Sequence, residues 1–533
     1  MEKRVIIAIA LSILVIVAFQ KLMPAPAYKQ AAQIQTESTV KDNVSQARLP
    51  QSKPKTAEKP KAILANVRTG VETDEFSVSL SSLTGAIQSA ELKEYAAQIF
   101  DNADAVNSLG AMALELQGRQ TVLEDWALTR EAGMVKYVYT DNENGFSIKK
   151  TFEFVDGQDY IRMTIGFSNE GSGNIMFGYS VVGPSCIMPV ESLKGRNFIA
   201  VDAEVDGKII RKSRAKNHLE TISGIVSWVD MRNRYYTVAM KAFTKCTAVI
   251  LKTRENGRLA TEMVMGQRSL FAGAAIEDTY LVYIGPIERD RLGACDPAFK
   301  SIVDFGFFGS ISIILLNMLG WIHGIVHNWG VAIIMVTLLI NIVLYPLTKK
   351  SFTSMRKMQE IQPHMEKLKQ LHKDNPQRMN KEVMELYKKY NVNPFGGCLP
   401  MLLQMPIFLA FYQVLLRSIQ LKNAGFLWIK DLSAPDAIFV LKSSLPFIGN
   451  KINILPLLTA VVMVLQQRVT MKQSAGGVND DLAKQQRLMA IFFPIFFCFI
   501  LYNFPAGLIL YWLTNSILMT TEQYYLRKQM SKD

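Results

Sequence analysis

Uncharged polar side chains recur at helical spacing inside the apolar segments near the C-terminus of this 533-residue chain. Thr337, Asn341 and Tyr345 are spaced i, i+4 and i+8, so they share one face of a helix. Tyr511 and Asn515 repeat this spacing in the last apolar segment. Amides and hydroxyls donate and accept hydrogen bonds, so the chemistry they indicate is contact with a polar partner rather than catalysis. The candidate contact residues are Thr337, Asn341, Tyr345, Gln404, Tyr511, Trp512 and Asn515.

These polar residues admit two interpretations. Side chains of this kind often form hydrogen bonds between membrane helices and hold a bundle together. Three separate apolar segments each supply amides or hydroxyls, however, and this favours a shared hydrated groove at membrane depth. The sequence alone leaves both interpretations open.

The five C-terminal apolar segments contain no Asp, Glu, Lys or Arg, and Arg417 lies just past the second of them. Transporters coupled to ions usually keep a charged residue at this depth, so its absence argues against secondary transport. No GxxxxGK[ST] loop is present, which argues against ATP-driven transport. The five cysteines form no CxxC pair, and we expect no metal, no cofactor and no catalytic residue.

The segment from Asn391 to Phe408 joins a basic, helix-patterned region to an apolar one through prolines, glycines and a glutamine. Pro400 and Pro406 each remove a backbone donor that lipid cannot replace. We therefore expect a polar, irregular surface inside the membrane. The residues expected to shape the backbone are Pro346, Pro394, Gly396, Gly397, Pro400, Pro406, Pro505 and Gly507.

The apolar segments indicate a polytopic α-helical membrane protein. Residues 1–23 are expected to form an N-terminal transmembrane anchor. The membrane core is expected over residues 329–526, with spans at about 329–348, 398–418, 452–469, 487–504 and 506–525. The apolar segments themselves (331–347, 398–416, 452–465, 488–502 and 506–519) are 14–19 residues long and cover about 21–29 Å at ~1.5 Å per residue, against a hydrocarbon core of ~30 Å. Short spans thin the bilayer locally, which lowers the cost of bringing a polar segment across.

Basic residues orient the chain. Lys3 and Arg4 precede the first segment, and residues 349–391 hold eleven Lys or Arg against five Asp or Glu. The 468–487 loop and the short tail at 527–533 are also basic, so both termini are expected in the cytoplasm. These loops account for much of the formal charge of +13, and we expect no specific nucleic-acid partner.

The first segment has an alternative interpretation as a cleaved signal peptide, because Ala25-Pro26-Ala27 has the small-x-small pattern of a cleavage site. The long apolar region and the proline beside the site favour an uncleaved anchor. The sidedness of the remaining chain is the same in either case.

Composition divides the remaining chain into a linker and a large water-exposed domain. Residues 24–62 are rich in Gln, Ala, Lys, Pro, Ser and Thr, which predicts a flexible linker. Residues 63–297 contain short alternating runs such as Tyr160–Phe167, which predict an all-β sandwich outside the cytoplasm. Residues 298–328 are expected to form an amphipathic helix along the outer membrane surface. A further span there would invert the topology downstream.

Residues 350–391 show a clear helical period. Met358, Ile361, Met365 and Leu368 follow 3,4,3 spacing, and the pattern resumes after a break at Asp374-Asn375-Pro376. Two antiparallel helices with a tight turn are expected, with a basic, methionine-bearing contact surface. The alternative is a solvated hairpin without a partner. The candidate contact residues are Arg356, Lys357, Met358, Met365 and Lys369.

Four motifs in this order resemble the YidC-type membrane protein insertases and their mitochondrial and chloroplast relatives. They are Leu344-Tyr-Pro-Leu-Thr348, Asn393-Pro-Phe-Gly-Gly-Cys-Leu-Pro400, Gln404-Met-Pro-Ile-Phe408 and Phe504-Pro-Ala-Gly-Leu508. The resemblance implies five core helices around a groove open to cytoplasm and lipid. The anchor and outer β-domain resemble the Gram-negative inner-membrane form, whose periplasmic domain is a β-supersandwich similar to sugar-mutarotase folds. It also implies nascent membrane proteins, the Sec translocon, and ribosomes or signal-recognition machinery as partners, beside the lipid bilayer.

One position departs from that family. The family usually places an arginine in the groove five residues before the proline of the Tyr-Pro-Leu motif, and here that residue is Asn341. An amide hydrates a groove but does not attract acidic client residues through charge, so we expect a weaker dependence on client negative charge. Trp512 stands where the family often has tyrosine.

The leading functional prediction is therefore an insertase and folding chaperone that acts without enzymatic chemistry. One alternative is an accessory chaperone of the translocon without independent insertase activity. A second is a sugar-binding β-domain on a membrane anchor. His218 is the one histidine before residue 323, which leaves few imidazoles for acid–base catalysis of a sugar.

Overall fold

The computed structural model describes most of the chain after the expected linker. The described residues are 68–101, 111–116, 126–189, 198–215, 218–254, 257–372, 375–390, 392, 399–445, 449–471 and 480–530. The expected anchor and linker lie outside them, as do Pro394, Gly396 and Gly397.

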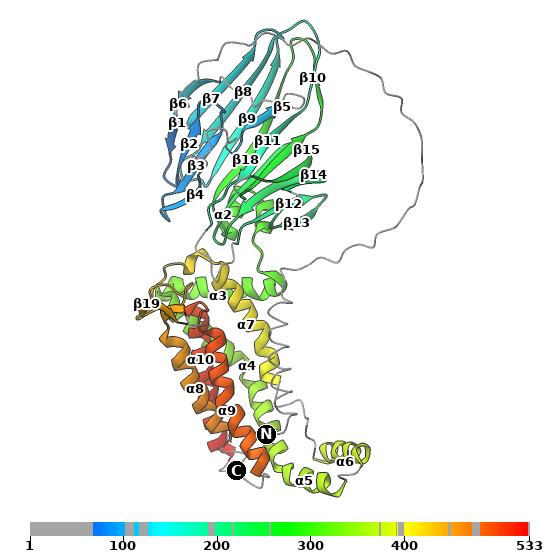
Figure 1. Cartoon of the computed structure of the whole chain (residues 1–533), viewed down its shortest axis with the longest axis vertical. Helices are drawn as coiled ribbons and strands as arrows, with labels where there is room; N and C mark the ends of the chain where they lie inside the picture. The colour runs from blue at the N-terminus through cyan, green and yellow to red at the C-terminus, as the bar shows by residue number, and fades with distance from the viewer. Residues whose placement is uncertain are drawn as a thin grey trace, which may run out of the picture. The chain divides into compact units, whose positions relative to one another are not determined.

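The N-terminal half of the described chain is built from antiparallel strands (Figure 1). A four-stranded sheet has the order β1-β2-β3-β4, and a twelve-stranded sheet has the main path β13-β12-β14-β15-β18-β9-β8-β7-β6, which β5, β11 and β16 join from the side. The strands are β1 (Arg68–Glu72), β2 (Phe76–Ser81), β3 (Ile87–Leu92), β4 (Ala97–Asp101), β5 (Leu114–Leu116), β6 (Ala127–Glu131), β7 (Met134–Asp141), β8 (Phe146–Phe154), β9 (Tyr160–Asn169), β10 (Ile175–Phe177), β11 (Tyr179–Ser185), β12 (Ala200–Val205), β13 (Lys208–Lys212), β14 (Leu219–Arg232), β15 (Tyr236–Thr253), β16 (Leu259–Met265), β17 (Arg268–Leu270) and β18 (Ala275–Pro286).

Alternation along the strands creates the core of this β-domain. In β8 the buried row runs through Phe146, Ile148, Phe152 and Phe154, while the residues that alternate with this row are half-buried or exposed. Lys150 lies in the same buried row, and its Nζ donates to the carbonyl oxygens of two loop residues. Burial lowers the pKa of Lys150 to about 7. The predicted all-β domain is confirmed.

The C-terminal half is mainly helical (Figure 1). The helices are α2 (Arg289–Cys295), α3 (Gly309–Val326), α4 (Trp329–Glu360), α5 (Gln362–Leu371), α6 (Pro376–Lys389), α7 (Leu399–Arg417), α8 (Ile454–Met471), α9 (Asp480–Leu501) and α10 (Ala506–Met530). Short 3-10 turns cover Pro297–Ile302, Gly306–Phe308 and Ile419–Leu421, and a two-stranded hairpin joins β19 (Phe439–Leu445) to β20 (Gly449–Ile452).

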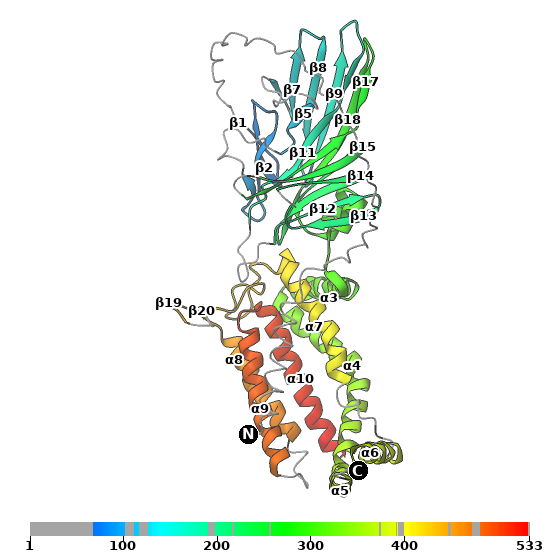
Figure 2. The same ribbon diagram turned by 45° about the vertical axis from the view of Figure 1, so that its right-hand side comes forward.

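The helices share an apolar core. Its fully buried members include Leu319 of α3, Ile333 of α4, Phe411 of α7 and Leu508 of α10. Helix α10 packs against both α4 and α8, and α3 packs against α4 and α7 (Figure 2). This arrangement places α4, α7 and α10 in contact with one another.

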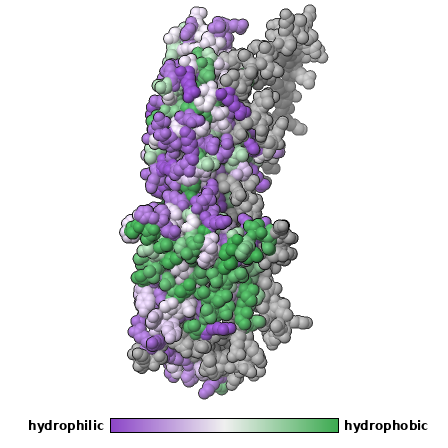
Figure 3. All heavy atoms as spheres, turned by 90° about the vertical axis from the view of Figure 1, so that its left-hand side faces the viewer, coloured by the Kyte–Doolittle hydropathy of each residue, from purple (hydrophilic) through white to green (hydrophobic). Residues whose placement is uncertain are grey.

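Large apolar side chains also cover the outside of the helices. Figure 3 shows them gathered over the helical part of the chain, whereas the strands expose mainly hydrophilic side chains. The exposed apolar residues of α8 and α9 include Leu457, Val461, Leu465, Ile491 and Ile495. An apolar surface of this extent is suited to contact with the hydrocarbon core of a lipid bilayer.

Within the described residues, Gly306–Val326 and Trp329–Met358 are long and apolar enough to cross a membrane by length and composition. The apolar parts of three further helices are shorter, at Leu403–Arg417, Ile454–Val469 and Ile491–Leu501. This matches the short apolar runs noted in the sequence. The interfacial placement expected for residues 298–328 stays a prediction.

The basic region differs in detail from the expected hairpin. Helix α4 continues past its apolar part to Glu360, and the first arm is divided at Ile361 before α5 begins. The second arm, α6, starts where Asn375 caps the helix by accepting from the backbone N–H of Arg378, and Pro376 occupies the first turn. Pro363 lies in the first turn of α5, a position that proline favours, and this accounts for the break between α4 and α5 at Ile361.

Candidate functional site: a polar seam between three helices

Five of the predicted contact residues lie buried where α4, α7 and α10 meet. We call this set the polar seam, and it consists of Thr337, Asn341, Gln404, Tyr511 and Asn515. Their exposed fractions are 0%, 8%, 9%, 0% and 5%, respectively. Helical spacing brings each helix's members to one face, and the packing of the three helices brings the faces together.

Two hydrogen bonds cross the polar seam between helices. Asn341 Nδ2 donates to Asn515 Oδ1 at 3.0 Å and joins α4 to α10. Gln404 Nε2 donates to the hydroxyl of Tyr511 and joins α7 to α10. The hydroxyl of Thr337 donates to the carbonyl oxygen of Ile333 in its own helix at 2.7 Å.

Asn341 also donates to the carbonyl oxygen of Thr337 at 2.8 Å. The two donor hydrogens of its amide are therefore both used. Buried polar groups at membrane depth are costly unless paired, so these bonds stabilise the closed arrangement of the three helices. The structure is thus compatible with both interpretations, hydrogen bonding between helices and a polar groove, because the groups that pair the helices are also those that a polar ligand would bind.

Aromatic rings border the polar seam. The ring of Tyr511 stacks on Phe411 with centroids 4.6 Å apart. Trp512 lies 5.1 Å from Phe408 and 4.6 Å from Phe497, centroid to centroid. Its indole Nε1 is buried and has no hydrogen-bond partner within the described part of the chain. Trp512 therefore offers a donor beside the polar seam.

Tyr345 does not join this set. It shares a helical face with Asn341 by spacing, but its side chain is 39% exposed. It follows Asn341 by one turn, at the point where α4 continues toward the basic arm. Its exposure separates Tyr345 from the polar seam, and its contact with a client stays a prediction.

The expected backbone-shaping residues fall at helix starts and inside helices. Pro346 lies within α4 and Pro406 within α7, while Pro400 is the second residue of α7. The carbonyl of Pro505 accepts from Leu508 at the start of α10. These placements fit the ways in which proline enters helices.

Gly507 allows α10 to approach its neighbours closely. A Cβ at this position would lie 2.8 Å from Leu415 Cδ2 and 3.2 Å from Ile333 Cδ1. A larger residue there would push α10 away from α7 and α4, the helices with which it forms the polar seam.

The basic arm carries the second set of expected contact residues. Arg356 forms an ion pair with Glu360 at 3.2 Å in α4, and Lys357 is exposed. Met358 and Met365 are half-buried. Lys369 belongs to α5, but its side chain lies outside the described residues. Contact of these residues with a partner stays a prediction.

Sequence reasoning missed two polar contacts that organise the helices. Ser312 of α3 donates to the carbonyl oxygen of Ala410 in α7 at 3.1 Å. Asp436 accepts from the backbone N–H groups of Ile454 and Leu455 at 3.0 and 2.7 Å and so caps α8 from a distant loop. Two serines near the start of α3, Ser310 and Ser312, were the available signal for the first contact, and the second has no local signal.

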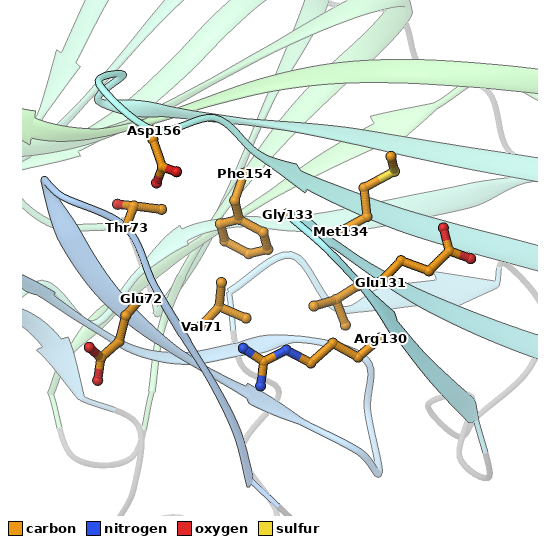
Figure 4. Close-up of a pocket in the computed structure, with 10 residues that line it drawn as sticks. Val71, Glu72, Thr73, Arg130, Glu131, Gly133, Met134, Phe154 and Asp156 are labelled. Carbon is orange, nitrogen blue, oxygen red and sulfur yellow. The ribbon is translucent and has the colours of Figure 1, made fainter.

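The β-domain contains a small pocket that bears on the sugar-binding alternative (Figure 4). Its volume is about 120 Å³, below the ~300–1,000 Å³ typical of ligand sites. Figure 4 shows Arg130 extending toward the strand of Val71, with Phe154 at the centre. His218 is exposed and is not among the lining residues. The pocket therefore offers little support for acid–base chemistry on a sugar.

The four described cysteines, Cys186, Cys246, Cys295 and Cys498, are free thiols. Among the described residues no group of His, Cys, Asp or Glu side chains has the arrangement of a metal site.

Comparison with known proteins places the chain in a family. Residues 68–318 match the family model for the YidC periplasmic domain, and residues 321–533 match that of the 60Kd inner membrane protein. The membrane protein insertase YidC of Geotalea daltonii is 32% identical over 558 residues, which cover 99% of this chain and 100% of the relative. That of Geobacter metallireducens is 30% identical, covering 100% of this chain and 99% of the relative.

Solved structures show looser similarity. A crystal structure of an active YidC insertase covers 86% of this chain with 19% identity and a TM-score of 0.36. A galactose mutarotase related enzyme from Lactobacillus acidophilus covers 41% of this chain with 10% identity and a TM-score of 0.33.

The chain belongs to the YidC family of membrane protein insertases. It is an inner membrane protein with a periplasmic β-domain and a helical membrane region. Its role is the insertion of membrane proteins, which is not an enzymatic reaction in the ordinary sense.

Proposed function

We propose that the polar seam is the place where a client's transmembrane segment enters the membrane. The observation that carries this proposal is the hydrogen bond between Asn341 and Asn515, which pairs buried amides between α4 and α10. A polar residue of the client exchanges hydrogen bonds with these amides while α4 and α10 separate. Because bonds are exchanged rather than lost, the cost of bringing a polar group to this depth falls.

Hydrophobic partitioning supplies the driving force. The client segment leaves the polar seam for lipid because burial of its apolar side chains is favourable by ~25 cal/mol per Å². The short apolar parts of α7, α8 and α9 favour a thinned bilayer beside the site, which shortens the distance that a polar flank must cross. Neither step requires a cofactor.

The side chain of Asn341 is uncharged, so the polar seam lacks the positive charge that an arginine at this position gives to other members of the family. An amide forms hydrogen bonds with neutral and acidic client residues alike. Insertion is therefore expected to depend only weakly on negative charge in the translocated segment of the client.

The proposed topology places both termini and the basic arms α5 and α6 in the cytoplasm, with the β-domain in the periplasm. The exposed Arg356 and Lys357 are then available to ribosomes or signal-recognition machinery. The Sec translocon is proposed as a further partner at the lipid-facing side. Accessory action on the translocon without independent insertion is the second candidate function.

Reconstitution tests these alternatives. The purified full chain is placed in liposomes, a small membrane protein is translated in vitro, and protease protection of its translocated segment is measured. We expect protection with the wild type and its loss when Thr337, Asn341 and Gln404 are all changed to leucine.

A matched variant controls for the loss of polar side chains in general. Thr521 is exposed and Thr353 is half-buried, and their hydroxyls donate to their own helices at 2.8 and 2.9 Å, respectively. Changing both to leucine is expected to leave protection unchanged. Protection by the triple variant would contradict the route through the polar seam, whereas no protection with folded wild type would favour the accessory role.

A further inference from the structure

A buried arginine in the turn between β14 and β15 bonds to the backbone of the membrane region. Arg234 is 7% exposed. Its Nε donates to the carbonyl oxygen of Leu416 at 2.6 Å, and its Nη2 donates to that of Ser433 at 3.1 Å. Leu416 belongs to the last turn of α7, where carbonyl groups lack partners within the helix. A cation at this end also complements the helix dipole.

The turn that carries Arg234 is held in a fixed shape. Asn233 Oδ1 accepts from the backbone N–H groups of Tyr235 and Tyr236 at 2.9 and 2.8 Å. Asn233 Nδ2 donates to the carbonyl oxygen of Met188 at 3.0 Å. The guanidinium of Arg234 lies 4.6 Å from the ring centroid of Tyr235. Arg234 is therefore presented in a restricted geometry, which reduces the entropy lost in bonding.

Neighbouring side chains extend this contact. The hydroxyl of Tyr235 donates to Ser433 Oγ at 3.1 Å, and Lys422 Nζ donates to the hydroxyl of Tyr236 at 3.3 Å. Ile419, two residues after α7, is 3% exposed and is packed in the apolar core of the β-domain. The outer end of α7 is thus attached to the β-domain by polar and apolar contacts together.

A second arginine fixes the same end of α7. Arg417 donates to the carbonyl oxygen of Asp304, which lies just before α3. The carboxylate of Asp304 also pairs with Arg211 of β13 at 3.4 Å. The β-domain, the start of α3 and the end of α7 therefore meet through charged groups.

Helix α7 connects this contact to the polar seam. Gln404 lies three turns before Leu416, about 18 Å away at ~1.5 Å per residue, and bonds to Tyr511 of α10. An outer end that is held restricts the tilt of the whole helix and leaves bending at Pro406 as the remaining movement of the inner end. Pro406 lies between the two points and is the position at which α7 bends most readily.

We propose that Arg234 is a positioning residue for insertion, through which the β-domain holds the outer end of α7 and keeps Gln404 opposite Tyr511. This inference rests on the proposed function of the polar seam. It gives the β-domain a mechanical role in insertion and requires no ligand of its own.

The test compares Arg234→Ala with two further variants in proteoliposomes of the full chain. Arg162→Ala is the matched control, because the Arg162 side chain is 52% exposed and pairs with Glu153 on the surface of the β-domain. Ile419→Ser weakens the contact between the end of α7 and the β-domain from the membrane side and leaves Arg234 in place. Nitroxide labels carried by unnatural amino acids at Glu170 and Met405 report the distance between the β-domain and α7.

We expect Arg234→Ala and Ile419→Ser to broaden the distance distribution and to slow client insertion at least threefold, with Arg162→Ala unchanged in both. A narrow distribution with Arg234→Ala would overturn the proposal, and so would a broad one with full insertion. Wild-type protein that inserts no client would instead refute the function of the polar seam, and the distance measurement would still report whether Arg234 holds α7.

Discussion

The hydrogen bond between Asn341 and Asn515 allows the energy of the polar seam to be measured directly. Changing Asn341 to alanine removes its bond to Asn515 Oδ1, an acceptor on a side chain that is 5% exposed. Its second bond, to the carbonyl of Thr337, lies within one turn of α4 and joins no second helix. The contribution between helices therefore comes from a single amide–amide bond of 3.0 Å.

A double-mutant cycle isolates this contribution. Side-chain hydrogen bonds between membrane helices contribute about 0.6 kcal/mol on average and up to about 1.7 kcal/mol. The bond here has good length and both groups are buried, so we expect a coupling of about 1 kcal/mol between Asn341→Ala and Asn515→Ala. The measurement is the free energy of unfolding in mixed micelles for the wild type, both single variants and the double variant.

A second cycle with Thr348→Ala and Thr514→Ala serves as the control. Both hydroxyls donate to carbonyls of their own helices, at 3.1 and 2.8 Å, so their effects should add. A coupling below about 0.3 kcal/mol for the asparagine pair would mean that the amides do not join α4 to α10. The physical basis of the proposed exchange with a client would then be refuted.

Three further outcomes are expected. Burial lowers the pKa of Lys150 to about 7, so between pH 7 and about 10.5 the unfolded chain binds more protons than the folded chain. The free energy of unfolding of the wild type should therefore rise relative to that of Lys150→Met by about 2 kcal/mol from pH 7 to pH 9, as measured by chemical denaturation. A constant difference would contradict this. A Cβ at Gly330 would overlap the ring of Phe426, so Gly330→Ala should destabilise the helical core by about 1–3 kcal/mol. Gly320→Ala is the control, because a Cβ there meets open space. Equal melting temperatures for the two variants would argue against this packing. Clients with aspartates added to the translocated segment should insert at rates within about twofold of the parent, since Asn341 carries no charge, and the protease-protection assay would reveal a stronger acceleration if this reasoning fails.

Periodicity predicted most of the architecture because it depends on local physics. The alternation in β8 is imposed by burial of one face, whereas the apolar runs of α7 and α10 suit helices with apolar surroundings on all sides, and the structure has a strand and helices there. The division of the first basic arm at Ile361 was not predicted, because the apolar spacing continues through it.

The site was predictable only in part. Thr337, Asn341, Gln404, Tyr511 and Asn515 were identified from residue type and spacing, and the structure brings them together. Which amide bonds to which group depends on how three separate helices pack. Spacing within one helix contains no such information.

Contacts that join distant segments were missed for the same reason. The cap that Asp436 provides for α8 and the bonds of Arg234 to the end of α7 link residues far apart in the chain. Each looks like an ordinary surface residue in the sequence. Their burial is a property of the tertiary structure.

Site-specific photocrosslinking during insertion tests the central claim most directly. A crosslinking amino acid replaces Thr514, which is half-buried beside Asn515, or Val461, which is 58% exposed on the outside of α8. With a client held at successive chain lengths, we predict that Thr514 captures its transmembrane segment early and loses it as the segment reaches lipid. Capture from Val461 at all lengths with none from Thr514 would contradict entry through the polar seam.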